Sequence, residues 1–370
     1  MKTNNMFSNR DQFKLGLFSA NCSGGLAVTK AVERWDNSWD NNLTMAKMAD
    51  EYGYDFLLPI ARWIGYGGET DFHGSVLETI TWATGLLAQT HNINVFATIH
   101  TAFNHPVVVA KQLATMDQVG RGRAGLNLVA GWNRPEYEAL GGDLPEDHQT
   151  RYRYAQEWYD VIQRLYAEQD PFEFQGEFWQ LERTYTNPKP LVEKLPVINA
   201  AGSDEGRAFA ARNADFLFTT VMSLEKTAEE IFRLKQAAAT QGRQLDVMTL
   251  ASCYCRPSRA EAQEYYQHIV SQADEGAIDN IVRIMFANAQ SFPKDALESL
   301  RERFAAGHGG WLLLGTPDDV ADGIEQMAQA GLGGSVFGFV DYIREMPYFQ
   351  QEVVPRLERK GLRLPQNVTA

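Results

Sequence analysis

The stretch LNLVAGWNRPEYEALG, from Leu126 to Gly141, starts as an apolar run and ends as a polar segment. Its first five residues are typical of a buried β-strand, except that they include the amide of Asn127. The strand pattern ends at Gly131 and Trp132, and carboxylates such as Glu136 follow. An amide inside the strand, an aromatic residue at its exit and carboxylates beyond it raise the question of what this strand end holds.

Seven further runs share the near-continuous apolar character that parallel strands show when both faces of their sheet are covered. The eight predicted strands are 14–20, 55–60, 93–99, 123–130, 195–201, 215–221, 247–254 and 335–340. The helical patterns between them are 40–52, 75–89, 106–119, 151–167, 204–213, 223–241, 259–273, 317–330 and 346–358. Eight strand–helix units predict an α/β fold of the TIM-barrel type, a (β/α)8 barrel, rather than an open doubly wound sheet.

We expect residues 1–370 to form a single TIM-barrel domain. A plain barrel takes about 250 residues, so roughly a hundred residues here are insertions, most of them after the C-terminal ends of strands, where barrels build active sites. The predicted insertions are approximately 21–38, 61–74, 132–150, 168–194 and 274–312. Segment 168–194 instead follows a helix, and its alternating aromatic residues around a glycine predict a small hairpin packed on the outside.

Composition and charge narrow the class of protein. Hydrophobic residues at 44 % and charged residues at 22 % are typical of soluble globular proteins, and the net charge of −13 argues against a nucleic-acid partner. The N-terminus has no signal-peptide core, and no apolar run approaches the roughly 20 residues of a membrane helix, so we expect a cytoplasmic protein with no membrane partner. Cys22, Cys253 and Cys255 form neither a disulfide framework nor a zinc spacing, and no metal site is expected.

Two glycine motifs lead to different interpretations. GRGRAG (120–125) matches a dinucleotide fingerprint formally, but its glycines follow a helix and precede a strand, so it predicts a helix-capping turn. In NAAGSDEG (199–206), a strand ends near Ala201, Gly202 allows a close backbone approach, and Ser203 can cap a helix. Such a junction offers free N–H groups to an anion such as phosphate, although an ordinary N-cap has the same pattern.

Four polar residues are further candidates at the barrel mouth. Arg151 and Tyr152 open a helix and could hold a phosphate by charge and hydroxyl, or could form a solvated first turn. Thr98 ends the third strand and Asn127 lies in the fourth, so we expect the two side chains to be neighbours. Buried polar groups need partners, and these two can satisfy one another or the backbone.

Five segments together resemble the flavin-dependent monooxygenases of the bacterial-luciferase-like barrel superfamily, in particular the dimethyl-sulfone monooxygenase and pyrimidine oxygenase branches. The segments are NCSGGLAVTK (21–30), ARWIGYGGETDFH (61–73), KQLATMDQVGRGRAGLNLVAGWNRPEYEALG (111–141), RYRYAQEW (151–158) and AAGSDEGRAFAARNADFLF (200–218). The resemblance covers nearly the whole chain, and LATMDQVGRGRAGLNLVAGW is its most specific part.

The resemblance implies a role for each matching residue. FMN would lie across the barrel mouth, in contact with Ala61, Arg62, Asn127, Glu136, Arg151, Tyr152, Gly202 and Ser203. Thr98 and Asn127 match the pair that frames the pocket where oxygen meets reduced flavin, and they are the expected catalytic residues. Arg62 stands where the pyrimidine oxygenase branch has lysine, so its contact differs from that of a point charge.

The same resemblance implies a two-component, FMNH2-utilising monooxygenase. A separate NAD(P)H:flavin reductase would supply FMNH2, and O2 would be the co-substrate. A flavin peroxide, at C4a or at N5, would attack a small organic substrate such as a sulfone, an N-heterocycle or cyclic amide, or a haloaromatic. Hydrogen-bond donors from Thr98 and Asn127 would orient the peroxide. The resemblance also suggests a homodimer or a homotetramer.

The sequence leaves the substrate and some rival functions open. Trp63, His100, Phe103 and Trp132 are candidate substrate contacts, and His100, His148 and His308 are candidate proton donors. An alkanesulfonate would need a cationic clamp, yet nothing in the sequence brings Arg34, Arg134 and Arg344 together. The alternatives are a deazaflavin- or flavin-dependent reductase of the same superfamily, a metal-dependent barrel hydrolase, and a flavin-binding protein without turnover.

Overall fold

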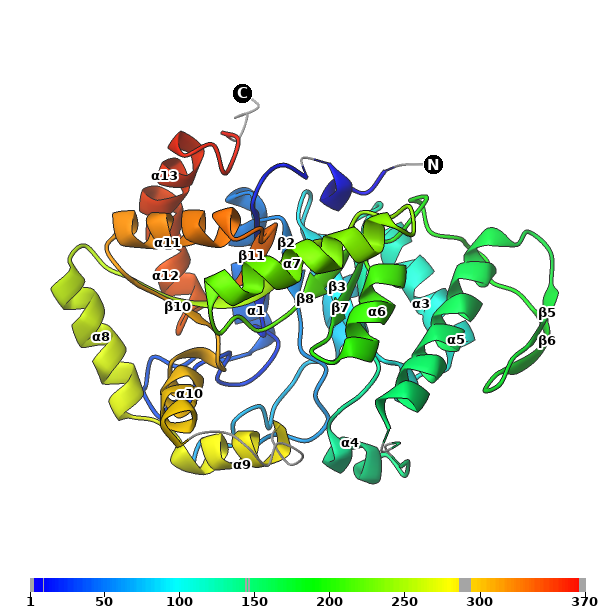
Figure 1. Cartoon of the computed structure of the whole chain (residues 1–370), viewed down its shortest axis with the longest axis horizontal. Coiled ribbons are helices and arrows are strands. Elements are labelled where there is room, and N and C mark those ends of the chain that lie inside the picture. Colours follow the sequence, from blue (N-terminus) through cyan, green and yellow to red (C-terminus); the bar gives the residue numbers. More distant parts are fainter. Residues whose placement is uncertain (1–2, 9, 144, 146, 286–293, 366–370) are drawn as a thin grey trace.

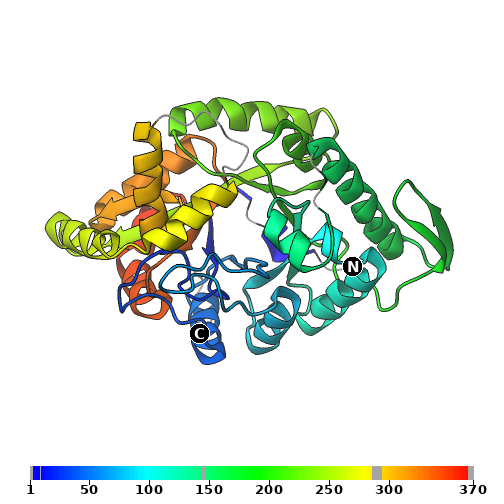
Figure 2. The same cartoon turned by 90° about the horizontal axis from the view of Figure 1, so that it is seen from below.

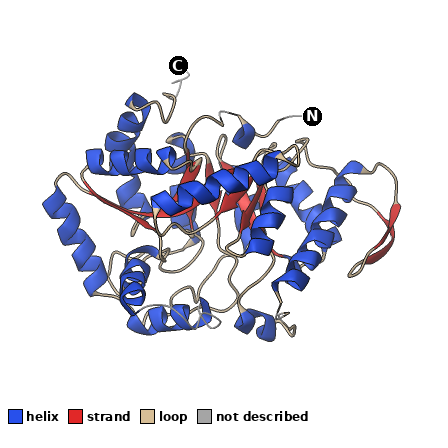
Figure 3. Ribbon diagram, in the orientation of Figure 1, coloured by secondary structure: helices blue, strands red, loops and turns tan. Residues whose placement is uncertain are grey.

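A closed parallel barrel forms the centre of the computed structural model, which describes residues 3–8, 10–143, 145, 147–285 and 294–365 (Figure 3). Its strands are β1 (Lys14–Phe18), β2 (Phe56–Leu58), β3 (Asn94–His100), β4 (Ala124–Val129), β7 (Val197–Ala200), β8 (Phe216–Phe218), β9 (Asp246–Cys255) and β11 (Gly334–Gly338). Each strand pairs in parallel with the next, and β11 pairs with both β9 and β1 to close the ring. The predicted TIM barrel and all eight predicted strands are confirmed.

A ninth parallel strand, β10 (Trp311–Gly315), was not predicted. It pairs with Ala251–Cys255 of β9, beyond Asp246–Met248, which pair with β8. Strand β9 is longer than β8. Along the edge that faces β8, its first residues pair with β8 and its last residues pair with β10. The sequence analysis placed the start of this strand inside insertion 274–312, because a run of five residues beside a long polar segment gives little periodic signal.

Helices surround the barrel (Figure 1). Those that match predicted segments are α1 (Trp39–Glu51), α2 (Thr79–Gln89), α3 (Pro106–Val119), α5 (His148–Ala167), α6 (Asp204–Asn213), α7 (Leu224–Ala239), α8 (Arg259–Ser271) and α11 (Pro317–Gln329). The last predicted helix is divided into α12 (Tyr342–Tyr348), a π-helical turn (Phe349–Val353) and α13 (Val354–Arg359). Within predicted insertions lie α4 (Arg134–Ala139), α9 (Glu275–Met285) and α10 (Lys294–Gly307).

The predicted hairpin is present as β5 (Phe172–Gln175) and β6 (Gln180–Thr184). The Glu157 carboxylate on α5 accepts hydrogen bonds from the backbone N–H groups of Glu177, Phe178 and Trp179 at 2.8, 2.9 and 2.6 Å. The hairpin therefore packs on the outer helix α5 and projects away from the barrel (Figure 1). The GRGRAG segment is a helix-to-strand turn, as predicted, since the N–H of Gly120 caps α3 by donating to the Met116 carbonyl at 2.8 Å.

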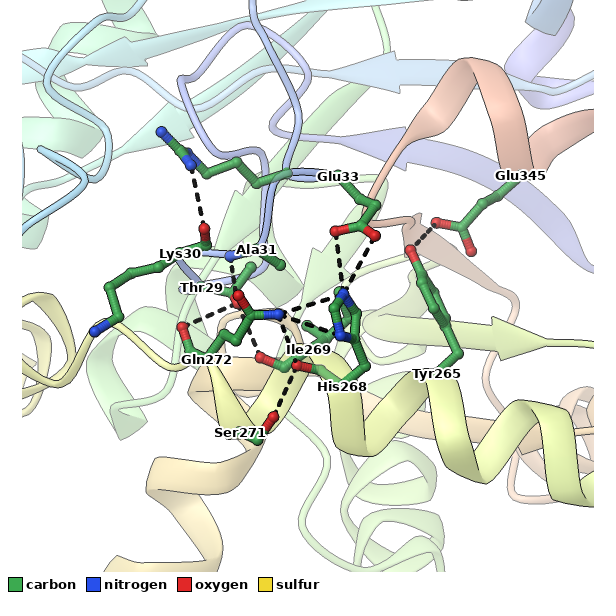
Figure 4. A network of polar contacts seen from close by, with 11 residues as sticks. Thr29, Lys30, Ala31, Glu33, Tyr265, His268, Ile269, Ser271, Gln272 and Glu345 are labelled. Carbon is green, nitrogen blue, oxygen red and sulfur yellow. Dashed lines mark hydrogen bonds and ion pairs between the residues drawn. The ribbon is translucent and has the colours of Figure 1, made fainter.

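The loop that follows β1 is tied to the outer helix α8. The Thr29 hydroxyl donates to the Ile269 carbonyl at 2.9 Å, and the Lys30 N–H donates to the Gln272 carbonyl at 2.7 Å. The Glu33 carboxylate lies 3.2 Å from the Nε2 of His268, which belongs to the same helix (Figure 4). These contacts fasten a long loop, which the sequence analysis predicted as insertion 21–38, to the rim of the barrel.

The N-terminal end of the barrel is plugged by the chain's own beginning. A 3-10 turn (Asn5–Phe7) inserts Met6, only 1 % exposed, into the interior cluster that includes Phe56, Phe96 and Phe216. The Asn4 amide donates to the Gly122 carbonyl at 2.9 Å and so fixes the turn beside β4. In Figure 1 both termini lie on this side, whereas α4 and α9 lie on the opposite side.

Candidate functional site

A cavity of about 440 Å³ lies at the carboxyl ends of the barrel strands, a size within the usual range of about 300–1,000 Å³ for ligand sites. Figure 2 views the molecule from this side. Its lining includes residues on strands, among them Thr98, Asn127 and Phe218. It also includes residues on loops, among them Arg62, Gly202 and His308. The cavity is therefore built from many separate segments of the chain, as is usual for barrel active sites.

Thr98 and Asn127 are neighbours in the register of β3 and β4, as predicted. The Asn127 Nδ2 donates to the Thr98 hydroxyl oxygen at 3.0 Å, and that hydroxyl donates to the Pro59 carbonyl at 2.6 Å. The hydrogen of Thr98 is thus already used, because a carbonyl can only accept. Contrary to the expectation that both side chains donate to a ligand, Thr98 positions Asn127, which keeps one N–H. The Oδ1 of Asn127 is buried without a partner.

Arg62 is the partner of the aromatic residue and of one carboxylate that follow β4. The Glu136 carboxylate lies 3.4 Å from Nη1 of Arg62 and accepts the Trp63 N–H at 2.8 Å. The guanidinium also donates to the Tyr66 hydroxyl at 2.8 Å and lies 5.3 Å from the centre of the Trp132 ring. Both side chains of the ion pair are buried, and the loss of their hydration is offset by the ion pair and by the hydrogen bonds to Trp63 and Tyr66. Trp132 and Glu136 together hold a buried cation at the cavity wall.

The start of α6 forms one corner of the cavity and has features typical of an anion-binding site. Ser203 caps this helix by accepting the Gly206 N–H at 3.2 Å, so the predicted N-cap is present. Gly202 lines the cavity, and no atom lies within 4 Å of the place where a Cβ would stand. The helix N-terminus and this open backbone provide the space and the N–H groups that a phosphate requires.

Two predicted residues of α5 stand next to this corner. Burial raises the pKa of Tyr152 to about 12, although the nearby Arg151 opposes the shift, so its hydroxyl keeps its proton at neutral pH. The Tyr152 ring packs on Phe209 of α6 at 5.6 Å between ring centres. Arg151 donates to the Gly131 carbonyl at 3.2 Å, which fixes the turn after β4. Both residues lie behind the cavity wall rather than in it.

Arg207 is a site residue that the sequence analysis missed. It lies one turn into α6, lines the cavity and forms ion pairs with Glu230 and, at 3.6 Å, with Asp204. Its Nε is buried without a partner. An arginine within an amphipathic helix is an ordinary pattern, and only its spacing from the Gly202–Ser203 cap could have singled it out.

The four predicted substrate contacts fall into two groups. His100 and Trp132 line the cavity. Trp63 does not line it and is 53 % exposed, and Phe103 packs edge-on against His100 and Tyr137 at 5.4 and 4.5 Å between ring centres. Phe103 therefore supports the wall from behind. None of Arg34, Arg134 and Arg344 lines the cavity, so no clamp for a sulfonate is formed by these three residues.

The histidines of the cavity do not suit the predicted role of proton donor. Burial and the neighbouring positive charge of Arg62 lower the pKa of His100, and likewise that of His308, to about 3. Both rings are therefore neutral at physiological pH and hold no transferable extra proton. His148 is exposed at the start of α5 and does not line the cavity.

The described part of the chain contains neither a candidate metal site nor a candidate membrane-spanning helix. No group of three or more His, Cys, Asp or Glu side chains there is arranged to hold a metal ion. No helix among those residues is both long enough and apolar enough to cross a membrane.

A TIM barrel whose mouth joins a buried cation, a positioned amide and free N–H groups at a helix start has the features of an enzyme that binds a phosphorylated ligand. Comparison with known proteins supports this class. The sequence model of the luciferase-like monooxygenase family matches residues 13–333. The chain belongs to this family, which confirms that it is a monooxygenase.

Individual relatives extend over almost the same length. The chain is 30 % identical to the FMNH2-dependent dimethylsulfone monooxygenase of Pseudomonas putida, over 92 % of this chain and 94 % of that protein. It is also 30 % identical to the pyrimidine monooxygenase RutA of Stutzerimonas stutzeri (strain A1501), over 94 % and 97 % of the two chains. The crystal structure of DmoA from Hyphomicrobium sulfonivorans has the same fold, with a TM-score of 0.82, 21 % identity and coverage of 95 % and 89 %.

Proposed function

We propose that the chain is the oxygenase component of a two-component system that depends on FMNH2 and O2. A separate NAD(P)H:flavin reductase supplies the reduced flavin, and the substrate is a small organic molecule such as a sulfone, an N-heterocycle or cyclic amide, or a haloaromatic. The names of the two relatives, an FMNH2-dependent dimethylsulfone monooxygenase and a pyrimidine monooxygenase, support this proposal. Bound FMNH2 supplies the electrons that activate oxygen, and the protein supplies binding, orientation and electrostatics.

The residues present fit FMN. The phosphate is held at the start of α6 by Gly202, Ser203 and Arg207, with Arg151 and Tyr152 behind them. The single observation that carries this assignment is the open backbone at Gly202, on the same cavity as Asn127, whose Oδ1 is buried and unpartnered. A Cβ at Gly202 would occupy the space that the ligand needs.

The ring system lies near Ala61, Arg62, Asn127 and Glu136. Arg62 brings positive charge to the reduced flavin and so favours its anionic form, and Glu136 holds the guanidinium in place. Asn127 would offer its remaining N–H to oxygen in the presence of the flavin, and Thr98 fixes the direction of that amide. Apolar side chains around these residues, including Trp132, exclude water from the site.

We also propose that the protein is cytoplasmic, that residues 1–370 act as one domain, and that the enzyme is a homodimer or a homotetramer. The net charge of −13 is consistent with no nucleic-acid or membrane partner, because both of those surfaces are anionic. In this proposal the reductase releases FMNH2, which reaches the oxygenase by diffusion.

The proposal is tested by measuring flavin binding and reoxidation without any organic substrate. FMNH2 is titrated anaerobically into the protein, a reduced deazaflavin serves as the comparison, and the FMNH2 complex is then mixed with O2 in a stopped-flow spectrometer. We expect tighter binding of FMNH2 than of the deazaflavin, and slower reoxidation of bound FMNH2 than of free FMNH2. Preference for the deazaflavin would instead favour a reductase of the same superfamily.

A further inference from the structure

His308 forms part of the cavity wall from a loop that the proposed flavin site does not use. It follows α10 and lines the same cavity as Arg62 and Asn127. Its ring lies 5.9 Å from the ring of Tyr66 and 5.7 Å from that of His73, measured between centres. His308 is not among the proposed flavin contacts, so its side chain is available for another ligand in the cavity.

The backbone around His308 is held in an unusual conformation. Six described residues other than glycine have a positive φ, and four of them belong to this side of the mouth: Ser19, Asp71, His73 and His308, at 63, 48, 57 and 52°. The Ser19 hydroxyl lies 3.5 Å from Nε2 of His73, whose ring in turn neighbours His308. Such strain is kept where the surrounding structure enforces it, and it gathers at functional sites.

The loop that carries His308 is clamped by Arg303. The guanidinium donates to the carbonyls of Gly309 and Gly310, at 2.7 and 3.1 Å, and to that of Val221 at 2.9 Å. Val221 follows β8, whose own loop lines the cavity through Thr219 and Thr220. The position of the His308 ring is therefore fixed by contacts outside the cavity.

The two histidines of the cavity share an arrangement of their ring nitrogens. In both His100 and His308, Nδ1 is buried and has no partner. A neutral imidazole carries one hydrogen, and a buried N–H without an acceptor costs more free energy than a bare ring nitrogen. The hydrogen is therefore assigned to Nε2, so that each ring offers one N–H donor at the cavity it lines.

The positive charge that acts on these two rings comes from Arg62. This guanidinium already has a counter-ion, since Glu136 lies 3.4 Å away and both side chains are buried. Burial and Arg62 keep the pKa of His100 and His308 at about 3, so both rings are neutral. A substrate anion bound in addition to the anionic reduced flavin would need a second, uncompensated cation here, whereas an uncharged oxygen acceptor needs only the two N–H donors.

We propose that His308, together with His100, binds the organic substrate through neutral N–H donors and selects an uncharged carbonyl or sulfonyl oxygen over a carboxylate or sulfonate. This inference rests on the proposed function, since the substrate shares the cavity with the flavin. It makes His308 a specificity-determining residue.

The test uses two pairs of probes, each made of a neutral compound and a related anion. Dimethyl sulfone is compared with methanesulfonate, and uracil with orotate, by proton NMR titration of the full chain saturated with FMN. The variant is His308→Asn, because asparagine accepts a left-handed backbone and so keeps the loop intact. The control is His91→Asn, an exposed histidine before β3 at the other end of the barrel. FMN affinity is measured separately for each protein.

We expect at least one neutral probe to bind about ten-fold more tightly than its anionic partner, and His308→Asn to remove most of that difference. FMN affinity stays within about two-fold, and His91→Asn behaves as the wild type. Equal or tighter binding of the anions, binding of no neutral probe, or an unchanged preference in His308→Asn overturns the inference. Failure of the wild type to bind both FMN and FMNH2 overturns the proposed function instead.

Discussion

At the scale of single residues, Asn127 has one N–H left after its hydrogen bond to Thr98, and that N–H is the proposed donor to activated oxygen. Asn127→Ala removes the donor but not the phosphate corner, so we expect FMN affinity to stay near the wild-type value. Turnover should shift towards hydrogen peroxide, since one preorganised donor contributes about 2–4 kcal/mol to a transition state. The measurement is the ratio of hydrogen peroxide to product, or to FMNH2 consumed.

The matched control is Asn94→Ala. Asn94 lies on the same strand β3 as Thr98, but at its N-terminal end, where its amide donates to the Asp55 carbonyl at 3.0 Å. This variant should lose some stability and keep its hydrogen peroxide yield. An Asn127→Ala protein that couples oxygen use to product as well as Asn94→Ala does would remove Asn127 from the proposed role.

Gly202 supports a second prediction at this scale. A Cβ at this position meets no protein atom within 4 Å, so Gly202→Ala should leave the free energy of unfolding within about 0.5 kcal/mol of wild type. The methyl group would enter the proposed phosphate space, so FMN affinity should fall by about ten-fold or more. Fluorescence titration with FMN checks this, and Gly142→Ala, in the loop after α4, is the control that should bind normally. Unchanged affinity in Gly202→Ala would place the phosphate elsewhere.

The sequence was most informative about residues whose position follows from local rules. Thr98 and Asn127 could be paired because parallel strands in register bring equivalent positions together. Ser203 could be assigned because an N-cap has a local pattern. Arg207 required the fold, and so did the place of His308, which the sequence offered only as one of three candidate proton donors, since the cavity unites a turn of α6 with a loop some hundred residues further along the chain.

At the scale of elements, the loop after β2 is fastened to α9 by one buried carboxylate. Asp274 accepts hydrogen bonds from the N–H and hydroxyl of Thr70 at 2.7 and 2.8 Å, and from the N–H groups of Glu69 and Ala277 at 3.2 Å each. Burial alone would raise the pKa of Asp274, but these hydrogen bonds outweigh it and lower the pKa below its ordinary value. The ionised form therefore stabilises the folded loop.

This shift fixes the pH dependence of the clamp. Because the folded pKa lies below the unfolded value of about 3.9, the contribution of Asp274 is fully present above that pH and is lost as the pH falls through the folded pKa. Asp274→Asn should cost about 1–3 kcal/mol at pH 7, and the difference from wild type should be smaller at a second pH, well below the unfolded pKa of about 3.9. Urea unfolding at the two pH values measures both.

The control for this clamp is Asp279→Asn, also on α9. Asp279 is 66 % exposed and pairs with Arg301. An exposed ion pair contributes little, so this variant should stay within about 1 kcal/mol of wild type at both pH values. Equal losses in the two variants would mean that Asp274 does not fasten the loop.

The elements themselves were predictable to different degrees. The barrel strands have continuous apolar runs, and the main helices have long amphipathic patterns, so both were identified before the fold was known. Strand β10 and helices α9 and α10 were not. Strand β10 is only five residues long and follows a long polar segment, and the apolar residues of α9 and α10 pack on loops over the mouth rather than on the sheet. Their apolar faces follow the shape of other loops, as in the cluster that joins Tyr66 and Phe72 to Ile278 and Phe304.

At the scale of the whole molecule, the two ends of the barrel have different tasks. The mouth contains four of the six described non-glycine residues with a positive φ, the buried Arg62–Glu136 pair and the open backbone of Gly202. The other end is filled by Met6, which is 1 % exposed and packs inside the barrel. This plug could not be predicted from the sequence, because the mostly polar N-terminal segment has no periodic apolar pattern.

The separation of the two ends leads to a prediction for Met6→Ala. Removing a buried methionine side chain typically costs about 2–5 kcal/mol, so the free energy of urea unfolding should fall by that amount. FMN affinity, measured well below the unfolding transition, should remain that of the wild type, since Met6 lies at the end of the barrel opposite the cavity. The control Val32→Ala truncates a side chain that is 89 % exposed and should change stability by less than about 0.5 kcal/mol. A loss of FMN affinity in Met6→Ala, in protein shown to be folded, would mean that the packing of the barrel interior transmits to the mouth, and stability and binding could then no longer be assigned to separate ends.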